Sequence, residues 1–275
     1  MRPLTSASRL RTDLVTGPGP ASVALLDVRW SLSTGPDRGA YAAGHLPGAA
    51  FVDLETALAG PPGARGRHPL PDPTRFVASM RAAGVSNDRR VVVYDDIGGI
   101  AAARAWWLLR HYGHRGVQVL DGGWSAWRRH GGAVQTGTPD IVAGDFHGGP
   151  GAMPVVDAEE AASLAAAGAL VDVRVAERFR GEQEPVDPVA GHIPGARNIP
   201  APGSLTADGL FHPADVLRER FAGVSEARVG AYCGSGVTAA HTVLALEVVG
   251  IEAALYPGSW SEWIADADRP VAVGD

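Results

Sequence analysis

The single cysteine of the chain, Cys233, is the residue whose type and surroundings offer the most reactive chemistry. It lies in YCGSGVT, between a strand-like run, RVGAY, and a run with helical periodicity, VTAAHTVLALEVVG. Gly234 and Gly236 permit backbone angles closed to other residues, so the loop can curl until several N–H groups point at one place. This cradle and the positive end of the following helix favour thiolate over thiol. The sequence therefore predicts a nucleophilic Cys233.

The alternative is that Cys233 is a buried space-filler, as most unpaired cysteines are. A repeat within the chain argues against it, because the stretch that matches YCGSGVTAA is YDDIGGIAA, with Asp95 in the position of the cysteine. The fold therefore does not require a small apolar side chain at this position. We interpret the pattern as one working site and one unit without chemistry.

The same short sequence motifs occur twice along the chain and in the same order. ALLDVRW leads to GHLPGA and LDGGWSAW, and ALVDVRV leads to GHIPGA and LYPGSWSEW. Each copy alternates short strand-like runs with helical stretches, which predicts an α/β fold with a parallel sheet and helices on both faces. Residues 137–154 are rich in Gly and Pro, and Asp157 follows as a helix N-cap. We predict two tandem domains, 1–145 and 146–275.

The composition of the chain limits the kinds of ligand and partner that the protein can bind. The net charge is −6, and all 24 basic residues are arginines, so nucleic acid is disfavoured and an anionic ligand must be bound by Arg or His. No apolar run approaches the ~20 residues of a membrane helix, and the histidines show no metal-binding spacing beyond His111 and His114, which a surface helix end explains as well. One cysteine excludes an internal disulfide, and the N-terminus lacks the apolar core of a secretory signal. We expect a cytoplasmic protein.

Four stretches, GHLPGA, GHIPGA, CGSGVTA and ERFRG, resemble the tandem rhodanese family, the thiosulfate and 3-mercaptopyruvate sulfurtransferases. The resemblance covers nearly the whole chain. It implies two similar α/β domains, a silent first and a catalytic second, and no cofactor or metal. It also implies that Cys233 takes sulfur from a small donor as a persulfide and passes it to a thiol, cyanide or protein acceptor.

The resemblance also assigns donor-binding residues. Arg178 in ERFRG matches the arginine that binds the anionic end of the donor, for which a guanidinium fork is well suited. The mercaptopyruvate branch usually has a second arginine in an EPR stretch, where this chain has Val186. Trp30 matches an aromatic beside the catalytic loop, with packing as its alternative role. The loop residues expected around the sulfur are Gly234, Gly236, Val237 and Thr238.

The mercaptopyruvate branch further implies a relay of three side chains. Here the candidates are Ser235, His68 and Glu55, with Glu where the family more often has Asp. Such a relay would polarise the donor carbonyl or move a proton to the departing enolate. The alternatives are an exposed loop histidine and a serine that only forms the loop.

Two other functions would use a similar cysteine. A rhodanese-like phosphatase needs an arginine six residues after the cysteine, and this chain has Ala239 there. A binding module that only carries sulfur or senses oxidants would share the cradle without needing Arg178 to bind a donor. The sequence therefore favours the sulfurtransferase.

Overall fold

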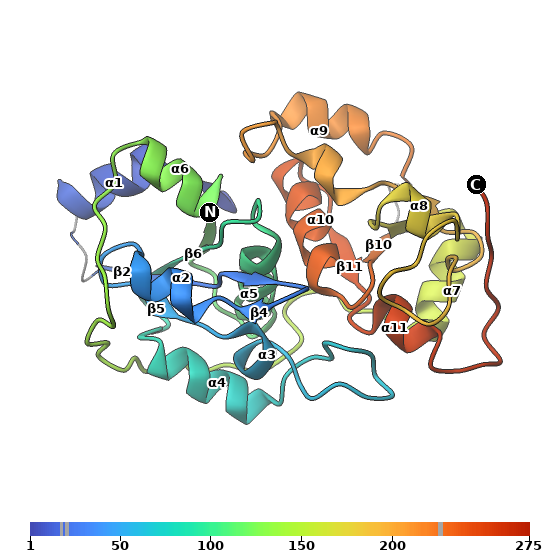
Figure 1. Ribbon diagram of the computed structural model, residues 1–275, viewed down its shortest axis with the longest axis horizontal. Coiled ribbons are helices and arrows are strands. Elements are labelled where there is room, and N and C mark those ends of the chain that lie inside the picture. The colour runs from blue at the N-terminus through green and yellow to red at the C-terminus, as the bar shows by residue number, and fades with distance from the viewer. Residues whose placement is uncertain (17–18, 20–21, 225–227) are drawn as a thin grey trace. The chain divides into compact units, whose positions relative to one another are not determined.

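The computed structural model describes residues 1–16, 19, 22–224 and 228–275, and its contacts divide them into two compact units (Figure 1). The first unit is Met1–Gly60 with Pro71–Met153 and Ala207–Phe211, and the second is Pro61–Leu70 with Pro154–Thr206 and His212–Asp275. The segment Pro61–Leu70 thus belongs with the second unit although it comes from the first half of the chain. The division after residue 145 stays a prediction.

The first unit contains a five-stranded parallel sheet in the order β1-β7-β6-β2-β5. Val and Leu dominate its central strands, which are buried as expected for a parallel sheet. An antiparallel pair, β3 and β4, lies outside the sheet. The strands are β1 Leu4–Thr5, β2 Val23–Asp27, β3 Trp30–Ser31, β4 Gly35–Pro36, β5 Ala50–Phe51, β6 Arg90–Tyr94 and β7 Val117–Leu120. The helices are α1 Ala7–Val15, α2 Arg38–Ala43, α3 Leu54–Ala57, α4 Pro73–Ala82, α5 Ile100–His111 and α6 Gly123–Arg129.

The second unit contains a four-stranded parallel sheet in the order β11-β10-β8-β9. Its strands are β8 Leu170–Asp172, β9 Arg197–Asn198, β10 Val229–Tyr232 and β11 Ala253–Leu255. Its helices are α7 Ala158–Ala166, α8 Ala176–Phe179, α9 Ala214–Arg220, α10 Val237–Val248 and α11 Ser259–Trp263, with a 3₁₀ turn, η2, at Ala201–Ser204. The α/β class with parallel sheets flanked by helices, predicted from the sequence, is confirmed.

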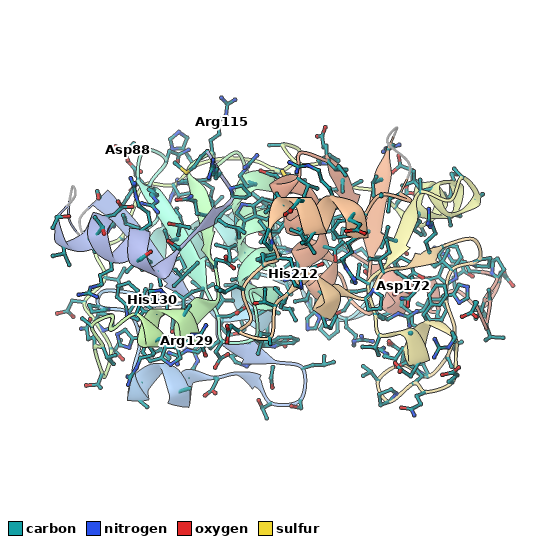
Figure 2. All side chains as sticks on the ribbon, turned by 90° about the horizontal axis from the view of Figure 1, so that it is seen from above. Asp88, Arg115, Arg129, His130, Asp172 and His212 are labelled. Atoms are coloured by element: carbon teal, nitrogen blue, oxygen red, sulfur yellow. The ribbon has the colours of Figure 1, made fainter. Side chains whose placement is uncertain are left out.

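The repeated DVR words build matching buried ion pairs. Arg29 donates through Nη2 to Asp27 at 2.7 Å, and Arg174 donates in the same way to Asp172 at 2.6 Å. Asp172, labelled in Figure 2, ends β8. Each guanidinium also donates to a backbone carbonyl at 2.7 Å, that of Gly44 or Gly191, at the start of the GHxPG word. These motifs therefore join the end of a strand to the segment that precedes the next one.

The GHxPG words are also structural. In the second unit His192 donates through Nδ1 to the Phe179 carbonyl at 2.8 Å, and the Ile193 N–H donates to the Tyr232 hydroxyl at 3.1 Å. His45 and Leu46 make the corresponding bonds in the first unit, at 2.9 and 3.1 Å. These repeated motifs thus stabilise the scaffold, because they satisfy buried polar groups beside the strand that carries the loop.

Helix ends follow the sequence signals closely. Asp157 caps α7 and forms a capping box with Glu160, and Gly250, with φ +84°, follows the end of α10. Within the described ranges, no helix is both long and apolar enough to cross a membrane.

Candidate active site

Cys233 lies between the end of β10 and the start of α10, as the sequence predicts. The residue is 3% exposed, and its Sγ accepts a hydrogen bond from the Gly236 N–H at 3.1 Å. Gly236 is the N-cap of α10, so this helix begins directly beside the sulfur. A sulfur anion here faces a backbone donor and the positive end of a twelve-residue helix.

The backbone of Cys233 is held by Ser259, which the sequence analysis did not single out. The Cys233 N–H donates to Ser259 Oγ at 3.1 Å, and Ser259 Oγ donates to the Tyr256 carbonyl at 2.9 Å. Ser259 has φ +54°, which is costly for a serine, and is the only described residue other than glycine with a positive φ. In the sequence, the repeat partner of Ser259 is a glycine, Gly123, and this was the available signal for an unusual backbone angle. In the structure Gly123 has φ +53°.

Only one of the two loop glycines has a positive φ, which corrects the expectation that both supply unusual backbone angles. Gly236 has φ +79°, and a Cβ there would overlap the Pro257 carbonyl. Gly234 is outside the left-handed region, but a Cβ there would lie 2.7 Å from Nη2 of Arg67. The end of the Arg67 side chain thus lies against Gly234.

Val237 and Thr238 form the first turn of α10, with the Val237 side chain buried. The hydrogen bond that the structure gives to the sulfur comes from Gly236. A wider cradle that includes the N–H groups of Val237 and Thr238 stays a prediction.

The first unit has the same loop, and there the cradle is filled. The Asp95 carboxylate accepts four backbone N–H bonds of 2.8–3.1 Å, from Ile97, Gly99, Ala101 and Ala102. Burial raises the pKa of Asp95 to about 6, although these bonds favour its ionised form. The loop between β6 and α5 thus binds an anion of its own, which shows that a strand–loop–helix of this shape suits negative charge.

Ser235 and His68 lie side by side in the second unit. His68 Nδ1 and Ser235 Oγ are 2.7 Å apart, and each residue is 5% exposed. The alternative interpretation of His68 as an exposed loop residue is therefore wrong. The structure brings together two of the three relay candidates.

Glu55 and Trp30 belong to the first unit, where they contact each other. The Trp30 indole N–H donates to Glu55 Oε1 at 2.7 Å. Trp30 is 6% exposed, and Glu55 lies on the short helix α3. Their roles in the relay and beside the catalytic loop stay predictions.

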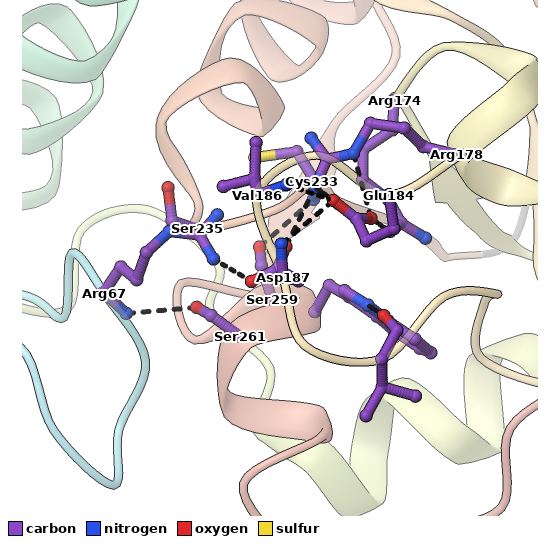
Figure 3. Close-up of polar contacts among 12 residues, drawn as sticks. Arg67, Arg174, Arg178, Glu184, Val186, Asp187, Cys233, Ser235, Ser259 and Ser261 are labelled. Atoms are coloured by element: carbon purple, nitrogen blue, oxygen red, sulfur yellow. Dashed lines mark hydrogen bonds and ion pairs between the residues drawn. The ribbon is translucent and has the colours of Figure 1, made fainter. Parts of the chain in front are cut away.

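Arg178 is paired with two buried carboxylates. Its Nη2 lies 2.7 Å from Glu184 Oε1 and 2.8 Å from Asp187 Oδ2, as Figure 3 shows. Burial alone would raise the pKa of Glu184, but hydrogen bonds from Arg178 and from the N–H groups of Asp187 and Val186 hold that pKa below its usual value. The predicted anion-binding arginine therefore already has internal counter-ions.

Arg67 joins this cluster and was missed by the sequence analysis. Its guanidinium pairs with the other oxygen of Asp187, and its backbone N–H donates to Ser261 Oγ at 3.0 Å (Figure 3). The only sequence signal was its position beside His68. One edge of the second sheet thus brings together four side chains, those of Arg67, Arg178, Cys233 and Ser235.

A strand–cysteine loop–helix in one copy of a repeated parallel α/β unit defines the class of protein. The family model described as rhodanese-like domain matches residues 11–130 and 157–266. The chain therefore belongs to the rhodanese-like family and carries two such domains.

The individual relatives have sulfurtransferase names. The chain is 48% identical to a probable 3-mercaptopyruvate sulfurtransferase of Pseudomonas aeruginosa over 91% of this chain and 92% of the relative. It is 46% identical to a putative thiosulfate sulfurtransferase, SseB, of Mycobacterium tuberculosis over 92% of this chain and 91% of the relative. The crystal structure of the Escherichia coli 3-mercaptopyruvate sulfotransferase SseA superposes with a TM-score of 0.80 at 33% identity, covering 95% of this chain and all of that one. The sulfurtransferase class predicted from the sequence is confirmed.

Proposed function

We propose that this sulfurtransferase moves a sulfane sulfur from thiosulfate or 3-mercaptopyruvate through a persulfide on Cys233 to a thiol, cyanide or protein acceptor. The observation that carries the proposal is the position of Cys233 Sγ, which accepts the Gly236 N–H at the start of α10. Two guanidiniums lie beside the adjacent Gly234 and suit an anionic donor.

The reaction divides into two half-reactions. The Cys233 thiolate attacks the outer sulfur of the donor, and the bond from that sulfur to the rest of the donor breaks. The electron pair of the broken bond leaves with the remainder of the donor. That remainder is sulfite when the donor is thiosulfate, and the enolate of pyruvate when the donor is mercaptopyruvate. In the second half-reaction the acceptor attacks the same sulfur and regenerates the thiolate.

The mercaptopyruvate reaction also needs a proton for the enolate. Ser235 and His68, in contact at 2.7 Å, are the groups we propose to supply it, with Glu55 as a proposed third member. Thiosulfate releases sulfite without this step. Loss of His68 should therefore slow transfer from mercaptopyruvate more than transfer from thiosulfate.

The choice of donor is a part of the proposal that the relatives do not decide, because one is named for mercaptopyruvate and another for thiosulfate. The neutral loop CGSGVT favours a monoanion, whereas Val186 removes one contact for a carboxylate. We therefore propose that the enzyme accepts both donors. We also propose that it acts in the cytoplasm.

The direct test is intact-mass measurement after incubation with each donor and removal of the excess. The parent protein should gain one sulfur atom, and a thiol acceptor should remove it. Cys233→Ser should gain none and should not turn over. Turnover in Cys233→Ser would contradict the proposal, and loading without any turnover would favour a sulfur-carrying module.

A further inference from the structure

The turn that leads into α11 contacts the cysteine loop through the side chain of Ser259 (Figure 3). We infer that Ser259 is a positioning residue for sulfur transfer, whose hydroxyl speeds persulfide formation by fixing the backbone of Cys233. The inference rests on the proposed function, because it concerns the first half-reaction on Cys233. Both residues belong to the second unit.

The start of α11 engages both backbone groups of Cys233. The Cys233 N–H donates to Ser259 Oγ at 3.1 Å, and the Cys233 carbonyl accepts the Trp260 N–H at 3.0 Å. The Ser261 N–H extends this contact by donating to the Gly234 carbonyl at 2.9 Å. The Cys233 backbone therefore cannot rotate without breaking one of these bonds, and its Sγ keeps its position at the start of α10.

The Ser259 hydroxyl is suited to hold a backbone group in a fixed direction. It accepts from Cys233 and donates to the Tyr256 carbonyl at 2.9 Å, and the residue is 0% exposed. A buried hydroxyl that both donates and accepts has one favoured orientation, because rotation would leave a buried polar group unpaired. The oxygen therefore stays directed at the Cys233 N–H.

A serine at this position strains the backbone. Ser259 has φ +54°, in a region that favours glycine, and the only other positive φ angles among the described residues belong to glycines. A glycine here would relieve the strain but would lose the hydroxyl. A strained residue in a buried turn beside a nucleophile points to a role for its side chain.

The first unit offers a direct comparison, because the repeat partner of the serine is Gly123. The Trp124 N–H donates to the Asp95 carbonyl at 2.8 Å, as Trp260 does to that of Cys233. A Cβ on Gly123 would lie 2.2 Å from the Asp95 carbonyl oxygen, so this turn has no space for a side chain. The backbone contact is thus common to both units, whereas the hydroxyl is present in the unit that carries the thiol.

Loss of the hydroxyl should slow the chemical step. The Cys233 N–H would lose its partner, and the sulfur would spend time away from the Gly236 N–H. Attack requires the sulfur to meet the donor within a narrow range of directions, so time spent in other positions lowers the rate. From the strength of a neutral hydrogen bond, we expect persulfide formation at saturating donor to slow by about three- to tenfold. The donor KM should stay unchanged, because Ser259 is fully buried and bonds the cysteine backbone.

The experiment compares Ser259→Gly and Ser259→Ala with Ser204→Ala. Ser204 is a buried serine of the same unit whose hydroxyl has no hydrogen-bond partner among the described residues. Rapid-quench measurement with each donor should give a lower rate constant of persulfide formation in both Ser259 variants. Ser204→Ala should keep the rate constant and the donor KM of the parent.

A second measurement reports on the backbone of Cys233 itself. Because the chain has one cysteine, isotopic labelling of cysteine nitrogen gives a single backbone amide signal. Hydrogen exchange of this amide should be faster in both Ser259 variants than in the parent and in Ser204→Ala. Unchanged exchange would show that the hydroxyl does not hold the Cys233 N–H.

The two Ser259 variants separate positioning from a general loss of stability. Glycine relieves the positive φ and alanine keeps it, so Ser259→Gly should have the higher Tm. Their rate constants should nevertheless be equal, because both lack the hydroxyl. Ser259→Gly should fold, since Gly123 occupies the matching position of the first unit.

Three results would overturn the inference. The first is a Ser259→Gly protein with the rate constant of Ser204→Ala. The second is a pair of Ser259 variants whose rate constants follow their Tm values, and the third is a loss confined to the donor KM. Absence of any persulfide in the parent and in Ser204→Ala alike would instead contradict the proposed function.

Discussion

At the scale of single residues, the ionic cluster beside Cys233 combines two tasks. Its carboxylates are buried and pair with Arg67 and Arg178, so they fix these side chains and also neutralise their positive charge. A monoanion requires less positive charge than a dianion. The carboxylates should therefore limit thiosulfate more than mercaptopyruvate.

Asp187→Asn should shift the preference between donors. The amide keeps the size of the side chain and removes one negative charge beside both guanidiniums, so the dianion gains more than the monoanion. We expect the ratio of kcat/KM for thiosulfate to that for mercaptopyruvate to rise several-fold. An unchanged or smaller ratio, measured at equal ionic strength, would show that charge at this position does not select the donor.

Glu184 should make the fold sensitive to acid. Its pKa is lowered in the folded protein, so the unfolded chain binds the proton more readily and the stability from Glu184 is present above its unfolded pKa. That contribution is lost as the pH falls through the folded pKa. Chemical denaturation between pH 7 and pH 3 should show a smaller loss of unfolding free energy in Glu184→Gln than in the parent. Equal losses would contradict this assignment.

At the scale of elements, the two strand–loop–helix segments have similar backbones but carry different side chains in their loops. Gly99 and Gly236 both cap their helices with positive φ, at 90° and 79°. One loop encloses its own carboxylate, and the other encloses a thiol. The side chain that follows the strand therefore decides which acceptor the N–H groups of the loop receive, a carboxylate or a sulfur.

Asp95→Asn should change the pH dependence of stability. Because the folded pKa is raised to about 6 from 3.8, the folded state holds the proton between these values and the unfolded state releases it. Stability from this group therefore falls as the pH rises through that window, by about 3 kcal/mol in total. Asp95→Asn should lack this fall, as measured by chemical denaturation from pH 4 to pH 7. A variant that parallels the parent would refute the buried titration.

At the scale of the whole molecule, two copies of one scaffold differ in the side chain that the loop after the strand carries, Asp95 in one and Cys233 in the other. Both copies have the buried Asp–Arg ion pair. In both, a tyrosine hydroxyl accepts a hydrogen bond from a backbone N–H of the GHxPG motif. Cys233, Ser235 and His68 lie in the second unit, whereas Glu55, the proposed third member of the relay, lies in the first. We therefore expect chemistry to depend on the second cradle alone.

Asp95→Asn should accordingly leave sulfur transfer within a few-fold of the parent at pH 7, whereas Cys233→Ser should abolish it. The measurement is donor turnover with a thiol acceptor on folded protein. A loss in Asp95→Asn comparable with that of Cys233→Ser would show that the first unit takes part in the chemistry.

The sequence by itself determined the features that depend on neighbouring residues and on repetition. Alternation of β-rich and helical runs predicted the parallel sheets, and Asp157 marked the start of a helix correctly. The duplication separated Cys233 from Asp95 because two copies of one loop can be compared position by position. These properties follow from local backbone preferences and side-chain periodicity.

Only the tertiary structure decided what distant segments do together. It showed that the Arg67 guanidinium lies against Gly234, that Ser259 Oγ accepts the Cys233 N–H, and that Asp187 pairs with Arg178. The contact of Arg67 with Gly234 joins residues far apart in the chain, and no local backbone preference encodes the partners of any of these three contacts. They form because packing of the sheet and helices excludes water and obliges buried charges and polar groups to pair with one another.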